Sequence, residues 1–574
     1  MPVHNKEISR LLNETADLLD IKGANEFRVR AYRNAARSVE SLPRPAAEIV
    51  AEGEDLSKED GIGKSLSEKI EEIVETGSLS QLQELKEELP PGLLELLDIP
   101  ELGPRRAGQL HKELGVDGLD SLENAIDEGK LPELEGFGEK LTDSIQKRVA
   151  EAKQQEGKDR MLLSEAEEIA DGLVSYLREA PGVDRIEVAG SYRRRKERVG
   201  DLDILVIASQ PAELMNRFTA YDLVEEVISK GETRSSVLLR GGKQVDLRLL
   251  APESYGSALM YFTGSKEHNI AIRSRAQERG YKVSEYGIFE GEKRRAGRDE
   301  EEAYALLGLP WIPPELRENR GEIDAAEKDS LPNLLELPDI RGDLHAHTDW
   351  SDGSASLEEM AEAARAHGYE YLAITDHSPA LTVANGLSED RLSKQIDKIA
   401  RLNEESDGFR LLASMEVNIN LDGSLDLSEE LLSRLDLVVC SIHSEMGRER
   451  DQQTERLIRA MDNKNCTIIG HPTGRRFDSR PGYELDFPRL IEAAAQRNVA
   501  FEINAQPERL DLSDTYARQA SEGGVKVAIS TDAHSPRHLG FMRYGVGQAR
   551  RGWIEAKDVL NTLGTEELLK AIKR

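Results

Sequence analysis

Apolar residues recur about every 3.6 positions through the first 150 residues and predict a series of amphipathic helices. Ile8, Leu11, Leu12, Ala16 and Leu19 show this spacing near the start of the chain. We therefore expect an all-α region here.

Three glycine turns interrupt this pattern, each just before an amphipathic helix. The turns contain Gly61, Gly63, Gly103, Gly136 and Gly138. Backbone N–H groups at a helix start can hold a phosphate, and glycine lets the phosphate approach closely. Lys64 and Arg105 add positive charge to two of the turns. The repeat predicts contacts to a DNA backbone, and a purely structural helical repeat is the alternative.

The middle of the chain changes to short alternating strands among helices. Asp201 and Asp203 open one apolar strand, and since side chains alternate along a strand, they point to the same side. Asp246 and Arg248 share a face of a later strand. Grouped carboxylates repel each other and are costly to bury without counter-charge. The pattern thus indicates either a metal site or solvated carboxylates at a strand edge.

The residues just upstream favour the metal site. Gly190 and Ser191 begin a turn in which residues 193–198 hold five basic side chains and one acidic side chain. Such a turn suits a phosphate, and three carboxylates can hold two divalent ions for phosphoryl transfer. We therefore expect a nucleotidyl-transfer centre in this part of the chain.

Beyond residues 318–338, which are polar and punctuated by proline and predict a linker, apolar strands alternate with helices. This order is typical of a parallel α/β barrel, whose active site lies at the C-terminal ends of the strands. We expect strands at residues 371–374, 411–413, 437–440, 467–469, 500–503 and 525–529.

Histidines and carboxylates follow the ends of these strands. Eight of the 11 histidines of the chain lie in this last segment. Imidazole and carboxylate are ligands of Zn²⁺, Mn²⁺ and Fe²⁺, so we expect a metal cluster. Arg475 follows one of these histidines and predicts either a contact to a substrate phosphate or a surface salt bridge.

Composition and charge limit the class of protein. At about 150 residues per domain, 574 residues predict three or four domains. No run reaches the roughly 18 apolar residues of a membrane span, and the N-terminus lacks a signal-peptide core, so we expect a cytoplasmic protein without a membrane partner. Two cysteines exclude a disulfide framework. The net charge of −32 is unusual for a DNA-binding protein, but residues 151–320 carry only −4 of it.

The first 320 residues resemble a family X DNA polymerase. The resemblance rests on Gly190-Ser191, Arg194, Asp201-x-Asp203, Asp246 and the turn at residues 261–265. It implies a multidomain chain with all-α helix-hairpin-helix regions and an α+β nucleotidyltransferase palm and thumb. The implied domains are a DNA-end-binding domain (1–80), fingers (81–155), palm (156–250), thumb (251–317), linker (318–338) and barrel (339–574).

The resemblance also implies roles for individual residues. Asp201, Asp203 and Asp246 would be the catalytic carboxylates that hold two Mg²⁺ or Mn²⁺ ions, with Asp246 as the proton acceptor of the primer hydroxyl. Tyr261 and Phe262 would pack against the sugar of the incoming deoxynucleotide. The other implied nucleotide-binding residues are Arg160, Gly190, Ser191, Arg194, Gly200, Gly264, Asn269 and Arg273.

Family members with 5'-deoxyribose phosphate lyase activity carry a Schiff-base lysine on the helix after the first hairpin, where Lys69 stands. Ser65 replaces a second lysine of those members, and Glu68 adjoins Lys69. An amine must lose its proton before it attacks an aldehyde, and these neighbours do not help it to do so. Lyase activity is therefore the less favoured interpretation.

Residues 339–574 resemble a PHP domain, a phosphoesterase barrel of distorted TIM-like α/β fold. The motifs that carry the resemblance are Asp343-Leu344-His345-Ala346-His347 and Thr375-Asp376-His377. It implies up to three Zn²⁺, Mn²⁺ or Fe²⁺ ions. The nine implied ligands are His345, His347, Asp352, His377, Glu416, His443, His471, Asp532 and His534.

The sequence thus predicts a monomeric gap-filling DNA polymerase of DNA repair, with gapped or primer-template DNA and deoxynucleotides as its partners. The barrel would add a 3'-5' exonuclease, with nicking at abasic sites as a second activity of the same domain. Two alternatives are a small-molecule phosphoesterase with a DNA-binding tether and a nonenzymatic scaffold that binds DNA ends. Both leave Asp201, Asp203 and Asp246 without a role.

Overall fold

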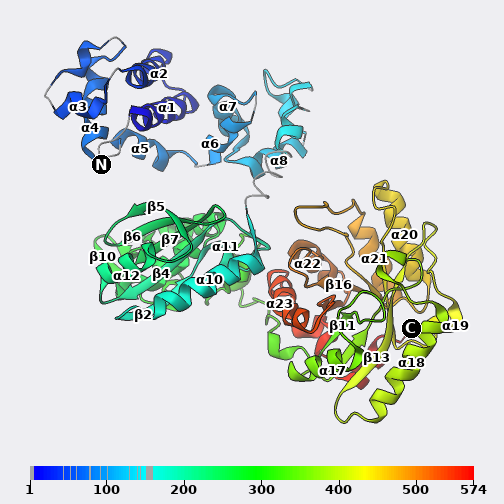
Figure 1. The fold of residues 1–574 in the computed structure, drawn as a ribbon. Helices are drawn as coiled ribbons and strands as arrows, with labels where there is room; N and C mark the ends of the chain where they lie inside the picture. The colour runs from blue at the N-terminus through cyan, green and yellow to red at the C-terminus, as the bar shows by residue number, and fades with distance from the viewer. Residues whose placement is uncertain are drawn as a thin grey trace. The chain divides into compact units, whose positions relative to one another are not determined.

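The structure is a computed structural model that describes residues 5–573, except 43, 52–53, 60, 77–78, 91, 100, 128, 139, 143 and 150–159. The chain divides into two compact units, Met1–Asp159 and Arg160–Arg574, and each is described by itself (Figure 1). None of the described helices has the length and hydropathy of a membrane span.

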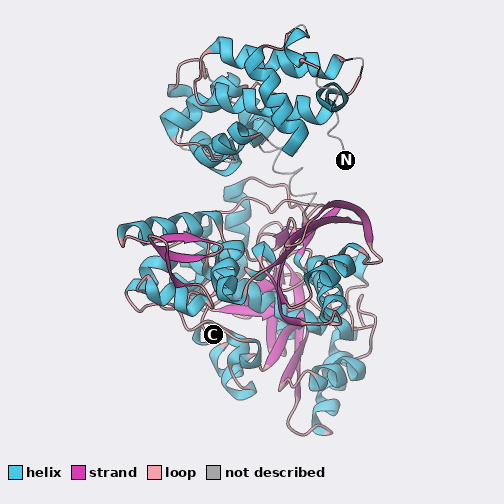
Figure 2. Cartoon of the chain, turned by 90° about the vertical axis from the view of Figure 1, so that its left-hand side faces the viewer, coloured by secondary structure: helices cyan, strands magenta, loops and turns pink. Residues whose placement is uncertain are grey.

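The first unit is helical, which confirms the prediction (Figure 2). Its named helices are α1 Asn5–Ile21, α2 Glu26–Ser41, α3 Ala46–Ala51, α4 Lys64–Thr76, α5 Ser80–Glu88, α6 Gly92–Glu95, α7 Pro104–Leu114 and α8 Leu119–Asp127. The predicted boundary at residue 80 falls inside one apolar core, which buries Leu79 and Leu82 together with Ile8 and Leu110. Residues 1–159 therefore form one compact unit, although two domains were expected there.

The three glycine turns share one backbone geometry. Gly61 and Gly136 have φ of 84° and 86°, and Glu101 adopts 79° at the matching place in the second turn. A positive φ costs little for glycine and more for a residue with a side chain. Two residues later, Gly63 and Gly103 each directly precede a helix, α4 and α7.

The second unit begins with the predicted palm. Its five-stranded sheet has the order β2-β4-β7-β6-β5, in which β4 and β7 are parallel and the other neighbours antiparallel. The elements are β1 Met161–Leu162, α10 Leu163–Arg178, β2 Val183–Val188, α11 Gly190–Arg193, β3 Arg198–Val199, β4 Leu202–Ala208, α12 Pro211–Thr219, β5 Val224–Lys230, β6 Arg234–Leu239 and β7 Lys243–Leu249.

The predicted thumb follows. Its elements are α13 Tyr255–Thr263, α14 Lys266–Glu278, β8 Lys282–Ser284, β9 Gly287–Glu290, β10 Lys293–Ala296 and α15 Glu300–Leu306. The residues expected to form a linker continue this part of the fold: they include α16 (Glu322–Glu327) and bury Ala326 and Leu334 in the thumb core. One of their polar side chains is buried and paired: Glu322 lies 2.6 Å from Nδ1 of buried His268.

A buried ion-pair group joins the thumb to the palm. Glu300 accepts two hydrogen bonds from Arg193, at 2.9 and 2.8 Å, and one from Arg317 at 2.6 Å. Burial alone would raise the pKa of Glu300, but the two guanidinium groups outweigh it and lower this pKa from 4.5 to about 2. The carboxylate is therefore ionised wherever the protein is folded near neutral pH.

We expect Glu300→Gln to lower the free energy of unfolding by about 3–5 kcal/mol, because it leaves two buried guanidinium groups without their counter-charge. The lowered pKa means that the stabilisation is complete above pH 4.5 and is lost as the pH falls towards 2. Urea unfolding at several pH values should show this difference shrinking in acid. The exposed neighbour Glu301, changed to glutamine, is the control, and an equal effect of both changes would refute the role of Glu300.

The barrel is a seven-stranded parallel sheet in the sequential order β11 to β17, and a bridge between Ala346 and Ala533 brings its first and last strands together. This confirms the predicted fold class. The strands are β11 Gly342–Ala346, β12 Tyr371–Ile374, β13 Arg410–Asn418, β14 Leu437–Ser441, β15 Ile468–Ile469, β16 Ala500–Asn504 and β17 Val527–Ser530. The prediction omitted β11, whose five residues include the polar Asp343 and His345.

Helices surround this sheet (Figure 1). They are α17 Leu357–Ala366, α18 Glu389–Glu404, α19 Glu429–Leu432, α20 Arg450–Asp462, α21 Phe487–Arg497, α22 Asp514–Glu522, α23 Met542–Arg551 and α24 Thr565–Ala571. One of them, α23, also reaches the palm, because Tyr544 is buried in the palm core together with Leu510 of the barrel. The Tyr544 hydroxyl donates to Glu167 of α10 at 2.6 Å.

Candidate active sites

The palm carboxylates meet where β4 and β7 run side by side. The parallel register places Asp203 directly opposite Asp246. Asp201 lies just before β4 and is exposed, Asp203 is partly buried, and Asp246 is buried. The structure therefore brings two of the predicted carboxylates together, with the third two residues away on the same face.

The two paired carboxylates differ in their electrostatics. Burial, and then repulsion by Asp201, raises the pKa of Asp203 to about 6. Burial would also raise the pKa of Asp246, but hydrogen bonds from Ser236, Gln244 and Arg234 outweigh it and lower this pKa. Asp246 is thus held as a carboxylate by its protein neighbours, while the charge of Asp203 is less well compensated and would be stabilised by a further positive charge.

Basic residues around this pair were only partly foreseen. Arg234 binds Asp246 at 2.7 Å, and Arg248 lies 3.8 Å from Asp203 and 3.5 Å from Asp246. The sequence placed Arg248 on the face of Asp246 but gave no sign of Arg234, which comes from the adjacent strand β6. Strand pairing, rather than any local motif, brings Arg234 to the site.

The turn that begins at Gly190 lies against the palm carboxylates. Gly190 has φ of 66°, and a Cβ atom there would stand 3.5 Å from Oδ2 of Asp203. Ser191 follows it in α11. Gly200 directly precedes Asp201, and Arg160 directly precedes β1, whose Met161 pairs with Val199 beside Gly200. Gly190 therefore borders Asp203, while Gly200 and Arg160 come near Asp201 through the chain and the pairing of β1 with β3.

Arg194 is held by the thumb and by the residues that follow it. Its Nε donates to Glu318 at 3.0 Å, and its Nη1 donates to the Thr263 carbonyl. Gly264, with φ of 69°, makes room for it, since a Cβ there would lie 3.1 Å from Nη1. The position of the arginine thus depends on residues far from it in the sequence.

The predicted aromatic pair lies next to this group at the end of α13. Tyr261 and Phe262 pack edge to face with ring centroids 5.2 Å apart, and Arg248 stands 4.2 Å above the Phe262 ring. Asn269 donates to the Tyr261 carbonyl at 2.7 Å, and Arg273 is exposed on α14. Arg248 thereby links the aromatic pair to Asp203 and Asp246.

The predicted DNA-contacting residues lie in the first unit. Lys64 is the first residue of α4 and is exposed, and Gly103 is the N-cap of α7. Arg105 is exposed and forms ion pairs with Asp20 and Glu26. Lys69 lies one turn into α4 and is partly buried. Hydrogen bonds from Ser80, and then the charge of Lys69, lower the pKa of Glu72, three residues further on.

Nine predicted ligand residues gather at the C-terminal mouth of the barrel. Glu416 lies at their centre. Its Oε2 is 2.9 Å from Nδ1 of His377 and 3.5 Å from Nε2 of His345. Its Oε1 is 3.1 Å from Nε2 of His443 and 3.0 Å from Nε2 of His471. One carboxylate thus joins histidines that follow or end four different strands.

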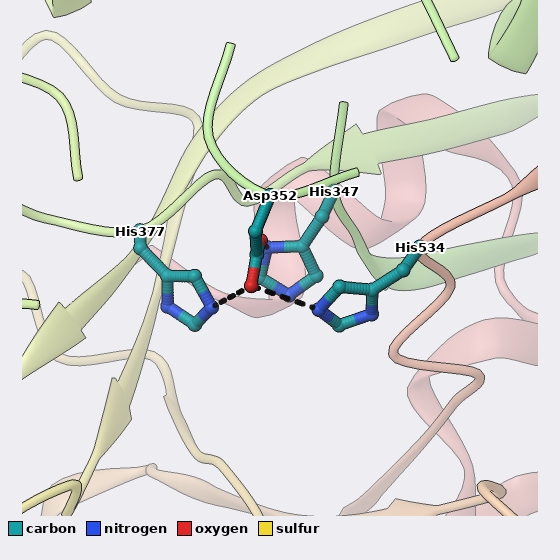
Figure 3. A group of neighbouring side chains, drawn as sticks. All are labelled: His347, Asp352, His377 and His534. Atoms are coloured by element: carbon teal, nitrogen blue, oxygen red, sulfur yellow. Dashed lines mark ion pairs between the residues drawn. The ribbon is translucent and has the colours of Figure 1, made fainter. Parts of the chain in front are cut away.

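Asp352 forms a second centre, shown in Figure 3. Its Oδ2 lies 3.5 Å from Nε2 of His377 and 3.4 Å from Nε2 of His534. The ring of His347 lies between these groups, with its Nε2 3.1 Å from Oδ1 of Asp532. All nine predicted residues are therefore brought into one connected group.

The chemistry of this group fits divalent metal ions. Three sets of donor atoms each lie within 4.8 Å of one another: His347, Asp352, His377 and His534; His345, His347 and Asp532; and His377, Glu416 and His443. Neither ring nitrogen of buried His347 has a well-aligned hydrogen bond. Burial, with the nearby His377 and His534, lowers the pKa of His347 to about 3, so its imidazole stays neutral. Neutral imidazole is the form that binds a metal.

Several supporting residues were not predicted. Glu502 in β16 lies 2.7 Å from Nδ1 of His345 and accepts from the backbone N–H of His471 at 2.6 Å. Such outer carboxylates orient ligating histidines and fix their tautomer. Asn504 donates to Asp532 at 3.1 Å. Glu502 and Asn504 alternate with apolar residues along β16. This two-residue period could have indicated them, but the strand was expected only as an apolar run.

Arg475 has neither of the two predicted roles. Its side chain is mostly buried and lies 2.5 Å from Oε1 of Glu197 in the palm. Gln548 of α23 also donates to this Glu197 oxygen, at 2.6 Å. An arginine that does reach the group of predicted metal ligands is Arg509, whose Nε lies 3.9 Å from Oδ2 of Asp532.

Comparison with known proteins agrees with this arrangement. Family models match a helix-hairpin-helix domain at residues 3–79, a SAM-like helix-hairpin-helix tandem at 93–151, a DNA polymerase beta thumb at 258–318 and a PHP domain at 343–506. A Bacillus subtilis (strain 168) protein named "DNA polymerase/3'-5' exonuclease PolX" is 41% identical over 576 residues and covers 100% of both chains. The chain belongs to the family X DNA polymerases with a C-terminal PHP domain.

Other relatives match parts of this family X chain. A probable phosphatase of Thermoanaerobacter sp. (strain X514) is 31% identical over 246 residues, which are 40% of this chain and 95% of that protein. A crystal structure of Leishmania infantum polymerase beta in a ternary complex covers 40% of this chain and 98% of that chain, with 22% identity and a TM-score of 0.27.

Proposed function

We propose that the chain is a DNA-directed DNA polymerase that fills short gaps during DNA repair and carries a 3'-5' exonuclease in its barrel. The observation that carries this proposal is the presence of two separate carboxylate centres in one chain of full-length similarity to the Bacillus protein. Asp203 and Asp246 form one centre, and the group around Glu416 forms the other.

In the palm, Asp201, Asp203 and Asp246 would hold two Mg²⁺ or Mn²⁺ ions, which neutralise the triphosphate charge when bound. Asp246, kept ionised by Arg234 and Gln244, is the carboxylate that we assign as acceptor of the primer hydroxyl proton. The 3' oxygen then bonds to the α-phosphorus, and pyrophosphate leaves.

The residues around the palm carboxylates would bind the nucleotide. Ser191, Arg194 and Arg160 would contact its phosphates, where Gly190 and Gly200 permit close approach. Tyr261 and Phe262 would contact its sugar at the turn that Gly264 opens. Asn269 holds the Tyr261 carbonyl and thereby this turn, and Arg273 would reach the minor groove from α14.

In the barrel, the nine ligands would hold up to three Zn²⁺, Mn²⁺ or Fe²⁺ ions, which supply an activated water for phosphodiester hydrolysis when bound. Glu502 orients His345 and Asn504 orients Asp532. Arg509, beside Asp532, would contact the phosphate of the DNA end. The backbones of the three glycine turns, with Lys64 and Arg105, would hold DNA in the first unit; we assign no lyase role to Lys69.

A labelled primer on a duplex with a short gap tests this proposal. With Mg²⁺ or Mn²⁺, we expect extension when deoxynucleotides are present and stepwise 3' shortening when they are absent. A chelator should stop both reactions. A relative named as a probable phosphatase matches 246 residues of this chain, so turnover of a small phosphomonoester without primer extension would favour the small-molecule phosphoesterase instead.

A further inference from the structure

Helix α23 of the barrel ends at the nucleotide side of the palm. Its last residue, Arg551, has a side chain that is only 2% exposed. The guanidinium donates to the Arg194 carbonyl at 2.8 Å, to Oε1 of Glu318 at 3.0 Å and to Oδ2 of Asp514 at 2.6 Å. A barrel arginine therefore contacts both the backbone of Arg194 and the carboxylate that binds the Arg194 side chain.

Glu318 is shared between the two arginines. Its Oε1 accepts from Nε of Arg194 and from Nη1 of Arg551, each at 3.0 Å, and its Oε2 lies 3.8 Å from Nζ of Lys196. A carboxylate that is shared in this way neutralises neither guanidinium completely. Arg194 can therefore keep positive charge for a further anion.

The charges of the side chains around Glu318 also favour an anion beside Arg194. Four basic side chains, Arg194, Lys196, Arg320 and Arg551, pair with two carboxylates, Glu318 and Asp514; a third carboxylate, Glu197, also acts on Arg551 but pairs with Arg475. Arg194 and Arg551 are mostly buried, whereas the side chains of Lys196 and Arg320 are 36% and 41% exposed and are screened by water. A surplus of buried charge of one sign is costly unless an oppositely charged ligand joins it. The surplus is positive and lies beside Gly264 and the turn after Gly190, where a triphosphate would bind.

We propose that Arg551 is a positioning residue for the nucleotide site of the polymerase. By fixing the Arg194 carbonyl it holds the turn, and by taking a share of Glu318 it leaves the Arg194 guanidinium available to the incoming triphosphate. The barrel thus completes the polymerase site in addition to its own hydrolytic chemistry. This inference rests on the proposed polymerase function.

The test compares Arg551→Met and Arg551→Lys with Arg550→Met in the full-length protein. Arg550 is the matched control, because it lies next to Arg551 in α23 and also joins the barrel to the thumb, at 2.7 Å from Glu315, without contacting the 190–196 turn. For each variant, KM and kcat for a deoxynucleotide on gapped DNA are measured together with 3'-5' exonuclease activity on a labelled single strand, which reports the folding of the barrel.

We expect Arg551→Met to raise KM about tenfold, which corresponds to ~1.4 kcal/mol, while kcat stays within about threefold and exonuclease activity within about twofold. Arg551→Lys keeps the charge but cannot make all three contacts, so KM should rise about threefold. Arg550→Met should leave KM unchanged, since a general loosening of the interface would affect both positions alike.

A wild-type KM in both Arg551 variants would overturn the inference, as would an equal rise of KM in Arg550→Met. If Arg551→Met does not fold, as shown by lost exonuclease activity, the KM of Arg551→Lys decides alone. A wild-type protein without any primer extension would instead reject the proposed function itself, so the two failures are distinguishable.

Discussion

Asp203→Asn is expected to lower nucleotide incorporation by at least about 10³-fold and to leave 3'-5' exonuclease activity within about twofold of wild type. The change removes a carboxylate opposite Asp246, at the place where two divalent ions would be held. Losing ~4 kcal/mol of charge stabilisation in the transition state produces a fall of this size. Single-turnover extension of a gapped primer measures it.

The same variant should be more stable than wild type in a chelator at pH 8. The pKa of Asp203 is raised from 3.8 to about 6 in the folded protein, so its cost to folding builds up between pH 3.8 and about 6 and is complete above pH 6; asparagine removes this cost. We expect a gain of up to about 3 kcal/mol at pH 8 that disappears below pH 4.

Asp184→Asn is the control for this pair of measurements, because Asp184 is an exposed carboxylate on β2 of the same sheet. It should change neither incorporation nor stability. If Asp203→Asn keeps wild-type incorporation, or if both activities fall together in a folded protein, then the palm carboxylates do not form an independent catalytic site.

Glu416→Gln is expected to have the opposite pattern, with exonuclease activity reduced at least about 10³-fold and primer extension within about twofold of wild type. Glu416 lies within 3.5 Å of a nitrogen of four histidines, so its charge is central to the cluster. A neutral amide binds divalent ions far less well than a carboxylate. Metal content after gel filtration should fall together with exonuclease activity.

The exposed Glu358 of α17, which pairs with Lys398 at 2.9 Å, gives the matched control as Glu358→Gln. It should retain both metal and exonuclease activity. An unchanged metal content in Glu416→Gln would contradict the assignment of this residue as a ligand, even if activity were lost.

The sequence allowed the two candidate centres to be located because their residues obey local rules. Asp201, Asp203 and Asp246 follow the two-residue period of strands, and the barrel ligands follow the ends of successive parallel strands. The order and direction of the strands are then enough to bring each set of residues together. This is why the nine residues predicted as barrel ligands lie in one connected group in the structure.

What could not be predicted depends on partners distant in sequence. Arg475 pairs with Glu197, 278 residues away, so its neighbourhood gives no sign of a palm contact. Residues 318–338 look like a solvated tether because they are polar, yet Glu322 is buried against His268. A polar composition does not show whether the hydrogen-bond partner of a side chain is water or a buried protein group.

The burial of Tyr544 and Leu510 of the barrel in the palm core has a consequence for the evolution of such chains. A mutation that removes a barrel ligand deletes hydrolysis but leaves this shared core intact. Deleting the barrel would expose that apolar surface and release Glu167 and Glu197 from their barrel partners. Selection can therefore remove the hydrolytic activity with little loss of stability. The barrel itself is retained because it covers the palm core.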